Sequence, residues 1–353
     1  MNVVNSFNEW DPLEEVVCGI VEGACYSPWH PLQEACTHEE YVEPLKQIHT
    51  ELGGLPRPDA LLAAARQEVD EFVHVLKAEG VTVVRPDPVN QALSYGTLDW
   101  HCAGGNSQAN PRDVMTVIGN EIIEAPMAKR SRFFEYTAYR TLIKNYFRQG
   151  AKWTAAPKPR MSDELYDPHW KRGTQSYLTT EFEPVWDAAD ITRCGRDIFF
   201  QRSQVSNRFA TEWLQRHLGD AYRVHLVEFA DDDAEHIDTT MVFLCPGKVL
   251  MNPIRPIRNS PDLFRKSGWE LLEPAPSVHT ENKAFAWYHL NLLMLDEQRV
   301  IVERDEQPFI AQLKNWGFKP IPIAFQSANR VFSGGFHCFT CDIRRRGSLQ
   351  SYF

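Results

Sequence analysis

The sequence predicts an α/β fold, a closed five-bladed α/β propeller of five ββαβ modules with pseudo-fivefold symmetry. Three observations support this prediction. A helical pattern that stops at a glycine and leads directly into a strand recurs along the chain. Paired apolar segments typical of β-hairpins lie between these units. A further pair is split between the two ends of the sequence, so that pairing its halves would close a ring. We therefore expect residues 1–353 to form a single domain.

The first helix–glycine–strand unit shows the pattern most clearly. Over residues 59–79, apolar side chains recur three and four positions apart, the spacing of one buried helix face. Gly80 follows where a helix-ending glycine is expected, and residues 81–86 (VTVVRP) have the composition of a strand. The expected buried positions are Leu62, Ala65, Val69, Phe72, Val73 and Leu76.

Four further segments repeat this order of helix, glycine and strand. The predicted helices are 132–149, 206–218, 261–267 and 307–316, and the glycines that follow them are Gly150, Gly219, Gly268 and Gly317. The predicted strands begin directly after these glycines, with KWTAAP, YRVHLVEF, WELLEP and KPIPIAF. Because the order is the same each time, we interpret each segment as the second half of one module.

Four hairpins are predicted between these units. They are 114–126, 190–201, 239–253 and 290–303, and their turns contain residues that favour tight turns, such as Gly-Asn and Pro-Gly-Lys. The fifth hairpin is split into VNSFNEWDPLEEVVCG near the start and HCFTCDIRRRG at the end. The longest loops are expected at 88–112 and 157–184.

Composition excludes several classes of protein. The chain is 43% hydrophobic and 24% charged, which is typical of a globular protein, and its formal net charge of −10 argues against binding to nucleic acid or anionic membranes. The first residues resemble neither a signal peptide nor a transit peptide, and no window approaches the ~20 apolar residues of a membrane helix. Eight irregularly spaced cysteines do not suggest a disulfide framework. We therefore expect a cytoplasmic protein with reduced thiols.

The C-x-x-C pair Cys338 and Cys341 allows three interpretations: a redox pair, half of a zinc site, or one nucleophile beside a bystander. The diglycine 334–335 and the alternating residues after it predict a strand, on which the two cysteines face opposite sides. Such a pair cannot meet disulfide geometry. A zinc site would need two more ligands at suitable spacing. We therefore favour a single nucleophile, Cys338, with His337 on the opposite face.

Candidate acid/base residues lie where the predicted modules begin. His236 and Asp238 are two positions apart and share a face before the hairpin at 239–253. Asp187 precedes the hairpin at 190–201, and Asp113 precedes that at 114–126. Each carboxylate could equally cap a turn, and His236 could simply be solvated. In a closed propeller, however, equivalent entrances converge on the axis, so we expect these residues to meet Cys338.

Several carboxylates around one thiol suit a planar, cationic substrate with an electrophilic carbon. A guanidinium has this character, since it offers N–H donors in a fork that carboxylates match. Ester or peptide hydrolysis would instead require an oxyanion hole. The residues therefore favour arginine chemistry.

The motifs FEPVWDAADITRCGRDIFFQRSQVSN, HIDTT, GNEIIEAPMAKRSRFFEY and GGFHCFTCDIRRRGSLQSYF resemble the amidinotransferases, and the resemblance extends from NEWDPLEEV to the last residue. The family includes enzymes of creatine, inosamine-phosphate and cyanobacterial toxin biosynthesis. The resemblance implies the pentein propeller, L-arginine as donor, a primary-amine acceptor and release of L-ornithine. We expect a role in natural-product or toxin biosynthesis rather than in creatine synthesis. It implies no cofactor and no metal, and relatives are often homodimers.

Residue roles also follow from the resemblance. It implies that Cys338 attacks the guanidinium carbon, that His236 moves protons, and that Asp187 completes a triad. Asp113 and Asp238 match positions that hold the guanidinium. Arg255, in NPIRP (252–256), matches a residue that binds the α-carboxylate of the donor.

Two departures from creatine-forming members concern the acceptor. Ala284-Phe285 replaces two serines that help to hold the amino-acid end of the substrate, so glycine is less expected as acceptor, although it stays an alternative. The run DDDAE (231–235) replaces neutral residues, so Glu235 and Asp233 could attract a cationic acceptor; a solvated acidic turn is the other interpretation.

Two rival functions remain. Arginine deiminases and dihydrolases share the propeller and a Cys-His pair, with water in place of the acceptor. A thiol-exchange protein would use both cysteines equally.

Overall fold

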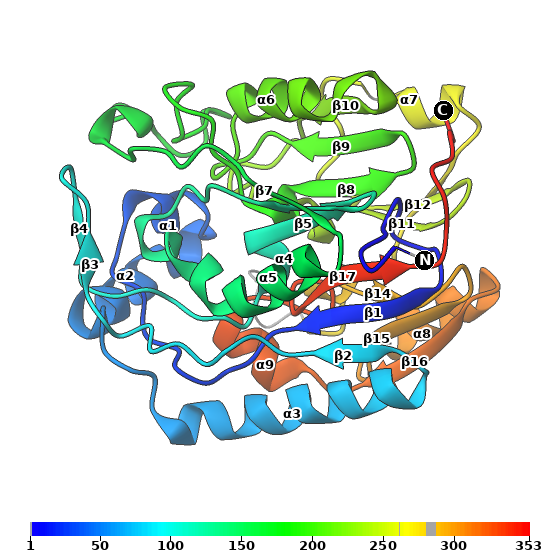
Figure 1. Cartoon of the computed structure of the whole chain (residues 1–353), viewed down its shortest axis with the longest axis horizontal. Coiled ribbons are helices and arrows are strands. Elements are labelled where there is room, and N and C mark those ends of the chain that lie inside the picture. The colour runs from blue at the N-terminus through cyan, green and yellow to red at the C-terminus, as the bar shows by residue number, and fades with distance from the viewer. Residues whose placement is uncertain (1, 261, 280–286) are drawn as a thin grey trace.

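The computed structural model describes residues 2–260, 262–279 and 287–353. Within these ranges, five three-stranded sheets surround a common centre, and the helices α3 (Asp59–Ala78), α6 (Arg208–Leu218) and α8 (Gln307–Asn315) lie at the periphery (Figure 1). This arrangement confirms the predicted five-bladed α/β propeller.

Each of the five sheets, here called blades, follows the predicted order of strands. Two strands form an antiparallel hairpin, a helix follows, and a third strand returns parallel to the second. Blade 1 contains β5 (Met115–Ile118), β6 (Glu121–Glu124), α5 (Arg140–Arg148) and β7 (Lys152–Ala155); blade 2 contains β8 (Ile191–Cys194), β9 (Asp197–Gln201), α6 (Arg208–Leu218) and β10 (Arg223–Val227). Blade 3 contains β11 (Met241–Cys245), β12 (Lys248–Met251), α7 (Leu263–Lys266) and β13 (Glu270–Leu272); blade 4 contains β14 (Leu293–Met294), β15 (Arg299–Glu303), α8 (Gln307–Asn315) and β16 (Lys319–Ile323).

Blade 5 joins the two ends of the chain. Its strand β17 (Thr340–Arg345) pairs antiparallel with β1 (Leu13–Cys18), which pairs parallel with β2 (Thr82–Val84) after α3 (Asp59–Ala78). In this register Cys18 lies opposite Thr340, and Val17 lies opposite Cys341. The split hairpin is therefore confirmed, and it closes the ring.

The helix α3 forms as its sequence pattern predicts. All six expected apolar positions are buried, and they pack with residues of β1 and blade 4. Gly80 has a φ of 88°, a conformation that costs little only for glycine. The chain can thus reverse directly from α3 into β2.

Apolar clusters fill each interface between successive blades, so the core is itself arranged as a ring. One cluster each is shared by blades 1 and 2 (Ile123 and Ile191), 2 and 3 (Phe199 and Phe243), 3 and 4 (Leu250 and Val300), 4 and 5 (Ile301 and Val16), and 5 and 1 (Cys341 and Val117). Burial of apolar surface is the main driving force of folding, and here it joins every blade to two neighbours.

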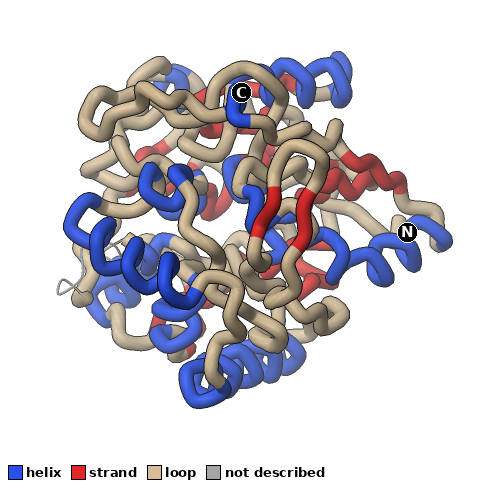
Figure 2. Tube along the Cα trace, turned by 90° about the vertical axis from the view of Figure 1, so that its left-hand side faces the viewer, coloured by secondary structure: helices blue, strands red, loops and turns tan. Residues whose placement is uncertain are grey.

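Several elements were not expected from the sequence. They are α1 (Pro31–Ala35), α2 (Glu39–Leu52), the hairpin β3 (Tyr95–Gly96) and β4 (His101–Cys102), and α9 (Gln326–Phe332). The predicted helix 132–149 begins as two 3₁₀ helices, Arg130–Arg132 and Glu135–Tyr139, before α5. Seen from the side of α1 and α2, helices and long loops lie in front of many of the strands (Figure 2).

Among the described helices, none is both long and apolar enough to cross a lipid bilayer.

Candidate active site

Short turns at the entrance of each blade carry the polar residues of the site. The helix α4 (Pro111–Val114) holds Asp113, and Asp187 precedes a 3₁₀ helix at Ala188–Asp190. His236 precedes another at Ile237–Thr239, which contains Asp238. A third at Tyr288–Leu290 is followed directly by Asn291. Because each turn leads into the first strand of its blade, the ring brings all five entrances to its centre.

The fifth entrance differs from its prediction. Residues 336–339 form a turn rather than a strand, and β17 starts only at Thr340. A side chain on Gly334 would place its Cβ 2.8 Å from the Cβ of Cys338, and one on Gly335 would come within 2.8 Å of the backbone oxygen of Asn291. The diglycine therefore permits a close approach of the backbone, and Cys338 lies within the turn that follows it.

The two cysteines of the C-x-x-C pair are free and separate in their contacts. The thiol of Cys338 lies among the entrance residues, whereas that of Cys341 is buried on β17 and contacts the backbone oxygen of Met115 at 3.4 Å. Because the two thiols have separate surroundings, this geometry supports neither a redox pair nor a zinc site that uses both cysteines.

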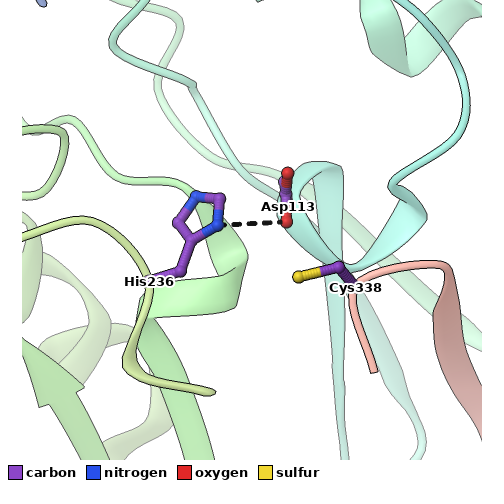
Figure 3. Close-up of side chains that lie close together, drawn as sticks. All are labelled: Asp113, His236 and Cys338. Carbon is purple, nitrogen blue, oxygen red and sulfur yellow. Dashed lines mark ion pairs between the residues drawn. The ribbon is translucent and has the colours of Figure 1, made fainter. Parts of the chain in front are cut away.

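His236 lies between two buried carboxylates. Its Nε2 is 3.1 Å from Oδ2 of Asp187, and its Nδ1 is 3.6 Å from Oδ1 of Asp113 (Figure 3). One ligand atom each of Asp113, His236 and Cys338 lies within 4.8 Å of the others. The backbone of His236 has a φ of 59°, a strained conformation for a residue other than glycine, of the kind that concentrates at functional sites.

The charges around His236 favour its protonated form. Burial alone would lower the pKa of His236, but Asp113, Asp187 and the contact with Cys338 outweigh it and hold that pKa well above the usual range. Burial raises the pKa of Asp113, whereas the hydrogen bond from His236 and the charge of Arg132 lower that of Asp187 in spite of burial. The resting site therefore contains an imidazolium between two carboxyl groups.

The thiol of Cys338 is in its neutral form in this environment. Burial and the charge of Asp238 raise the pKa of the thiol, and the nearby His236 offsets only part of this effect. The sulfur lies 3.3 Å from Oδ2 of Asp238 and 3.1 Å from Nδ2 of Asn291. A further positive charge beside the sulfur would be needed to favour the thiolate.

Three buried carboxylate oxygens in the site lack hydrogen-bond partners among the described residues. They are Oδ1 of Asp113, of Asp187 and of Asp238. Buried acceptors without a partner are costly and uncommon in native proteins. Those of Asp113 and Asp238 lie on groups that contact His236 and Cys338, respectively. The site can therefore accept a ligand with several N–H donors.

Two side chains hold these carboxylates in place: Arg132, which the sequence did not single out, and His337, which was expected to face away from Cys338 but contacts the same oxygen of Asp238. Arg132 contacts Asp113 at 2.8 Å and Asp187 at 3.2 Å, and its orientation is fixed by Glu135 at 2.7 Å. The Nδ1 of His337 donates a hydrogen bond to Oδ2 of Asp238 at 2.7 Å. Nothing in the local pattern marked Arg132, since it lies in a predicted helix, but its place three residues before Glu135 is a spacing typical of ion pairs.

A buried ion cluster lies behind Asp238. It joins Glu9, Arg112, Arg193, Asp342 and Arg345, and the separations within it range from 2.7 Å to 3.7 Å. His337 connects this cluster to the site, because its Nε2 lies 3.4 Å from Glu9. Fully paired buried charges of this kind fix a unique arrangement of the segments that carry them.

The outer residues of the site are already paired. Arg255 contacts Asp231 at 3.0 Å and the hydroxyl groups of Thr239 and Thr240 at 3.3 Å and 3.4 Å. Glu235, whose Oε1 is 4.0 Å from Nε2 of His236, forms an ion pair with Lys129. Ala284-Phe285 lies outside the described residues.

In the same way, Asp233 is paired with Arg172. The acidic run at 231–235 thus has a cationic partner for three of its members, and it is not a simple solvated turn.

Some of these side chains are also of the types that bind metal ions. Asp113, His236 and Cys338 form one compact ligand set, and Asp187, Glu235 and His236 form another. In both sets, however, an acidic member is already paired with a fixed cation, Arg132 or Lys129. Because these cations already neutralise part of the negative charge, the site suits a singly charged organic cation better than a divalent metal ion.

Comparison with known proteins identifies the family. No family model matches the chain. An L-arginine:L-lysine amidinotransferase of Pseudomonas savastanoi pv. phaseolicola is 47% identical over 99% of this chain and 96% of its own length. A mitochondrial glycine amidinotransferase of Gallus gallus is also 47% identical, over 99% of this chain and 85% of its own.

Solved structures agree with these relatives. SxtG, an amidinotransferase of the saxitoxin pathway of Microseira wollei, aligns with a TM-score of 0.94 and 48% identity over 99% of this chain and 100% of its own. A dimethylarginine dimethylaminohydrolase, at 12% identity and a TM-score of 0.60 over 93% of this chain and 99% of its own, shares the fold alone. With the entrance residues assembled as the motifs require, and with relatives of this similarity along nearly its whole length, the chain belongs to the amidinotransferase family.

Proposed function

We propose that this protein transfers the amidino group of L-arginine to a primary amine through a covalent intermediate on Cys338. The observation that carries the proposal is the pair of buried, unpartnered oxygens of Asp113 and Asp238 beside the thiol and His236. A guanidinium offers N–H donors on both sides of a planar carbon, so the two oxygens can hold it with that carbon facing the sulfur. The bound cation also supplies the positive charge that the thiol needs in order to ionise.

In the first half-reaction, the sulfur of Cys338 attacks the guanidinium carbon and the bond from that carbon to the side-chain nitrogen of arginine breaks. His236 gives its proton to the leaving nitrogen and receives the proton of the thiol, so the products are a thiouronium on Cys338 and L-ornithine. Asp187 orients the imidazole through Nε2, which leaves Nδ1 for this exchange. We assign Asp187, His236 and Cys338 to the catalytic triad on this basis.

In the second half-reaction, a primary amine attacks the thiouronium carbon. As the bond between that carbon and the sulfur breaks, His236 gives its proton to the departing sulfur and receives the proton that the attacking amine loses, so the products are a guanidino compound and the enzyme in its starting form. One acid/base group thus serves both steps, and ping-pong kinetics follow. Arg255 would hold the α-carboxylate of the donor once its pairing with Asp231 is exchanged for the substrate.

The acceptor is proposed to be an amine of a natural-product or toxin pathway rather than glycine in creatine synthesis. Supporting this, the charged pair of Glu235 and Lys129 lies beside His236, and a cationic acceptor could share the carboxylate of Glu235. The names of the relatives include lysine and a toxin pathway as well as glycine, so glycine is retained as an alternative acceptor.

One experiment tests the covalent step directly. The protein is mixed with arginine alone and digested, and the masses of its peptides are measured by mass spectrometry. We expect the mass of one amidino group on the peptide that contains Cys338, together with one equivalent of ornithine. If no mass gain appears on that peptide, the proposal fails. A hydrolase on the same fold would instead release citrulline or ammonia in repeated turnovers without any acceptor amine, so these products are assayed in the same mixture.

A screen of primary amines then identifies the acceptor. Each amine is added with arginine, and ornithine release beyond the first equivalent is measured. An acceptor sustains turnover, whereas a non-acceptor leaves only the initial release.

A further inference from the structure

Asn291 occupies the entrance of blade 4 and contacts the nucleophile directly. It follows the 3₁₀ helix Tyr288–Leu290 and is buried. Its Nδ2 lies 3.1 Å from the sulfur of Cys338. The other four entrances supply Asp113, Asp187, the pair His236 and Asp238, and Cys338 itself, so Asn291 is the contribution of the remaining blade.

The backbone fixes which end of this amide faces the sulfur. The Oδ1 of Asn291 accepts hydrogen bonds from the backbone N–H of Cys338 at 2.9 Å and from that of Gly335 at 3.1 Å. An NH₂ group cannot accept these two bonds. If the amide were rotated, its NH₂ group would face the two backbone N–H groups, and all three would be donors without an acceptor. The geometry therefore requires that Nδ2, a hydrogen-bond donor, points to the sulfur.

A donor at this position acts on the charged form of the sulfur. Hydrogen bonds to an ionised partner are stronger than those between neutral groups, so the amide stabilises the thiolate more than the thiol. Near the sulfur, Asp238 has the opposite effect, since its carboxylate disfavours a second negative charge. The thiolate occurs in both half-reactions, as the attacking group in the first and as the leaving group in the second.

We propose that Asn291 is a further catalytic residue, which donates a hydrogen bond to the sulfur of Cys338 and holds it toward the substrate carbon whenever it is a thiolate. The inference rests on the proposed function, because it assumes that Cys338 is the nucleophile. It assigns two tasks to one side chain: Oδ1 holds the turn in place, and Nδ2 stabilises the charge on sulfur.

The variant Asn291→Asp separates these two tasks. It has the same shape and keeps an oxygen for the two backbone N–H groups, but it replaces the donor with a second acceptor. Asn291→Gln keeps an amide and tests rescue by a longer side chain. Asn8→Asp is the matched control, because Oδ1 of buried Asn8 also accepts two backbone N–H groups, those of Trp10 and Asp11, and Asn8 does not touch the thiol.

The rate of the first half-reaction is measured by rapid quench after mixing with arginine. The amidino adduct on Cys338 and the released ornithine are both quantified, and the measurement is repeated over a range of pH. A lost hydrogen bond to a charged group predicts an adduct rate lower by about 10- to 100-fold in Asn291→Asp. We expect the rise of this rate with pH to move to higher pH, while the KM for arginine changes by less than about threefold. Asn291→Gln should recover part of the rate, and Asn8→Asp should react as the wild type does.

Two results would overturn the inference. One is an adduct rate and pH profile in Asn291→Asp that equal those of the wild type. The other is a uniform loss, with unchanged pH profile and no recovery in Asn291→Gln, which would show that Asn291 only supports the turn. If the variants do not fold, the side-chain amide resonance of Asn291 in the wild type is followed by NMR, and it must shift as Cys338 ionises. Failure of the proposed function looks different, because the wild type itself would then form no adduct.

Discussion

The imidazole Nδ1 of His337 lies 2.7 Å from Oδ2 of Asp238, and the thiol of Cys338 approaches the same oxygen at 3.3 Å. His337, the neighbour of Cys338 in sequence, thus positions the carboxylate of another blade rather than the sulfur. Burial and Arg112 would lower the pKa of His337, but the hydrogen bonds to Asp238 and Glu9 raise it. A cationic His337 can hold Asp238 in its charged form while Oδ1 stays available to a ligand.

Replacing His337 with glutamine should weaken binding of the donor. Glutamine cannot carry the charge that fixes Asp238, so we expect the KM for arginine to rise by about tenfold, as when a hydrogen bond to a charged group is lost. Initial-rate kinetics with saturating acceptor measure this change. His217→Gln is the control, since the Nε2 of His217 makes a similar contact of 3.0 Å with Glu121 away from the thiol. An unchanged KM would contradict the role of His337.

The two cysteines should differ sharply when each is replaced with alanine. Cys338→Ala should abolish turnover and the amidino adduct, whereas Cys341→Ala should leave both intact. Because Cys341 packs in the core between blades 5 and 1, its replacement should cost about 1 kcal/mol of unfolding free energy, the scale of a small buried group. Mass spectrometry and urea denaturation measure the two effects. Equal losses of activity would instead favour a thiol-exchange protein.

The ion pair of His236 and Asp187 should stabilise the fold in a pH-dependent way. The folded pKa of His236 is raised, so the contribution of its charge is complete below the unfolded pKa and is lost as pH rises through the folded value. The stability difference between the wild type and Asp187→Asn should therefore be largest below the unfolded pKa of about 6.5, and it should shrink as the pH rises through the folded pKa of His236. Denaturant titrations at several pH values measure it. A difference that is constant with pH would mean that His236 is neutral in the folded protein.

The Glu235–Lys129 pair should set the preference for the acceptor. Glu235→Gln leaves Lys129 uncompensated, so the KM of an acceptor with a second amine, such as lysine, should rise relative to that of glycine. Lys129→Met frees the carboxylate and should lower the same ratio. Ornithine release with each acceptor gives the two KM values, and the first half-reaction with arginine serves as the internal control because it precedes acceptor binding. If neither variant changes the ratio, Glu235 does not select the acceptor.

Much of the fold could be predicted because the sequence patterns are local. The periodicity of residues 59–79 and the glycine after it were sufficient for α3, and similar signals marked each blade. The turn at 336–339 was wrongly expected to be a strand, since alternating residues follow the diglycine. The decisive fact there is a contact with Asn291, which is distant in sequence and has no local signal.

Some residues of the candidate site could be singled out from local sequence patterns, and others could not. The structure brings together Asp113, Asp187, His236, Asp238 and Cys338, as expected. The first four were singled out because they stand before predicted hairpins, and Cys338 because it belongs to the C-x-x-C pair. Arg132, which holds two of these carboxylates, was missed because it lies within a segment whose spacing resembles an amphipathic helix. Its 3₁₀ geometry and inward direction depend on the ion pairs it makes, and those depend on the assembled ring.

The pairing of β1 with β17 also has a consequence for synthesis on the ribosome. Strand β1 emerges early, but its partner lies more than three hundred residues later, so its edge stays open until nearly the whole chain has been made. Contacts of such long sequence separation form slowly, and open strand edges promote aggregation in the meantime. Cys338 lies directly before that late partner, so a chain that ends before β17 would lack both ring closure and the sulfur on which the proposed transfer depends.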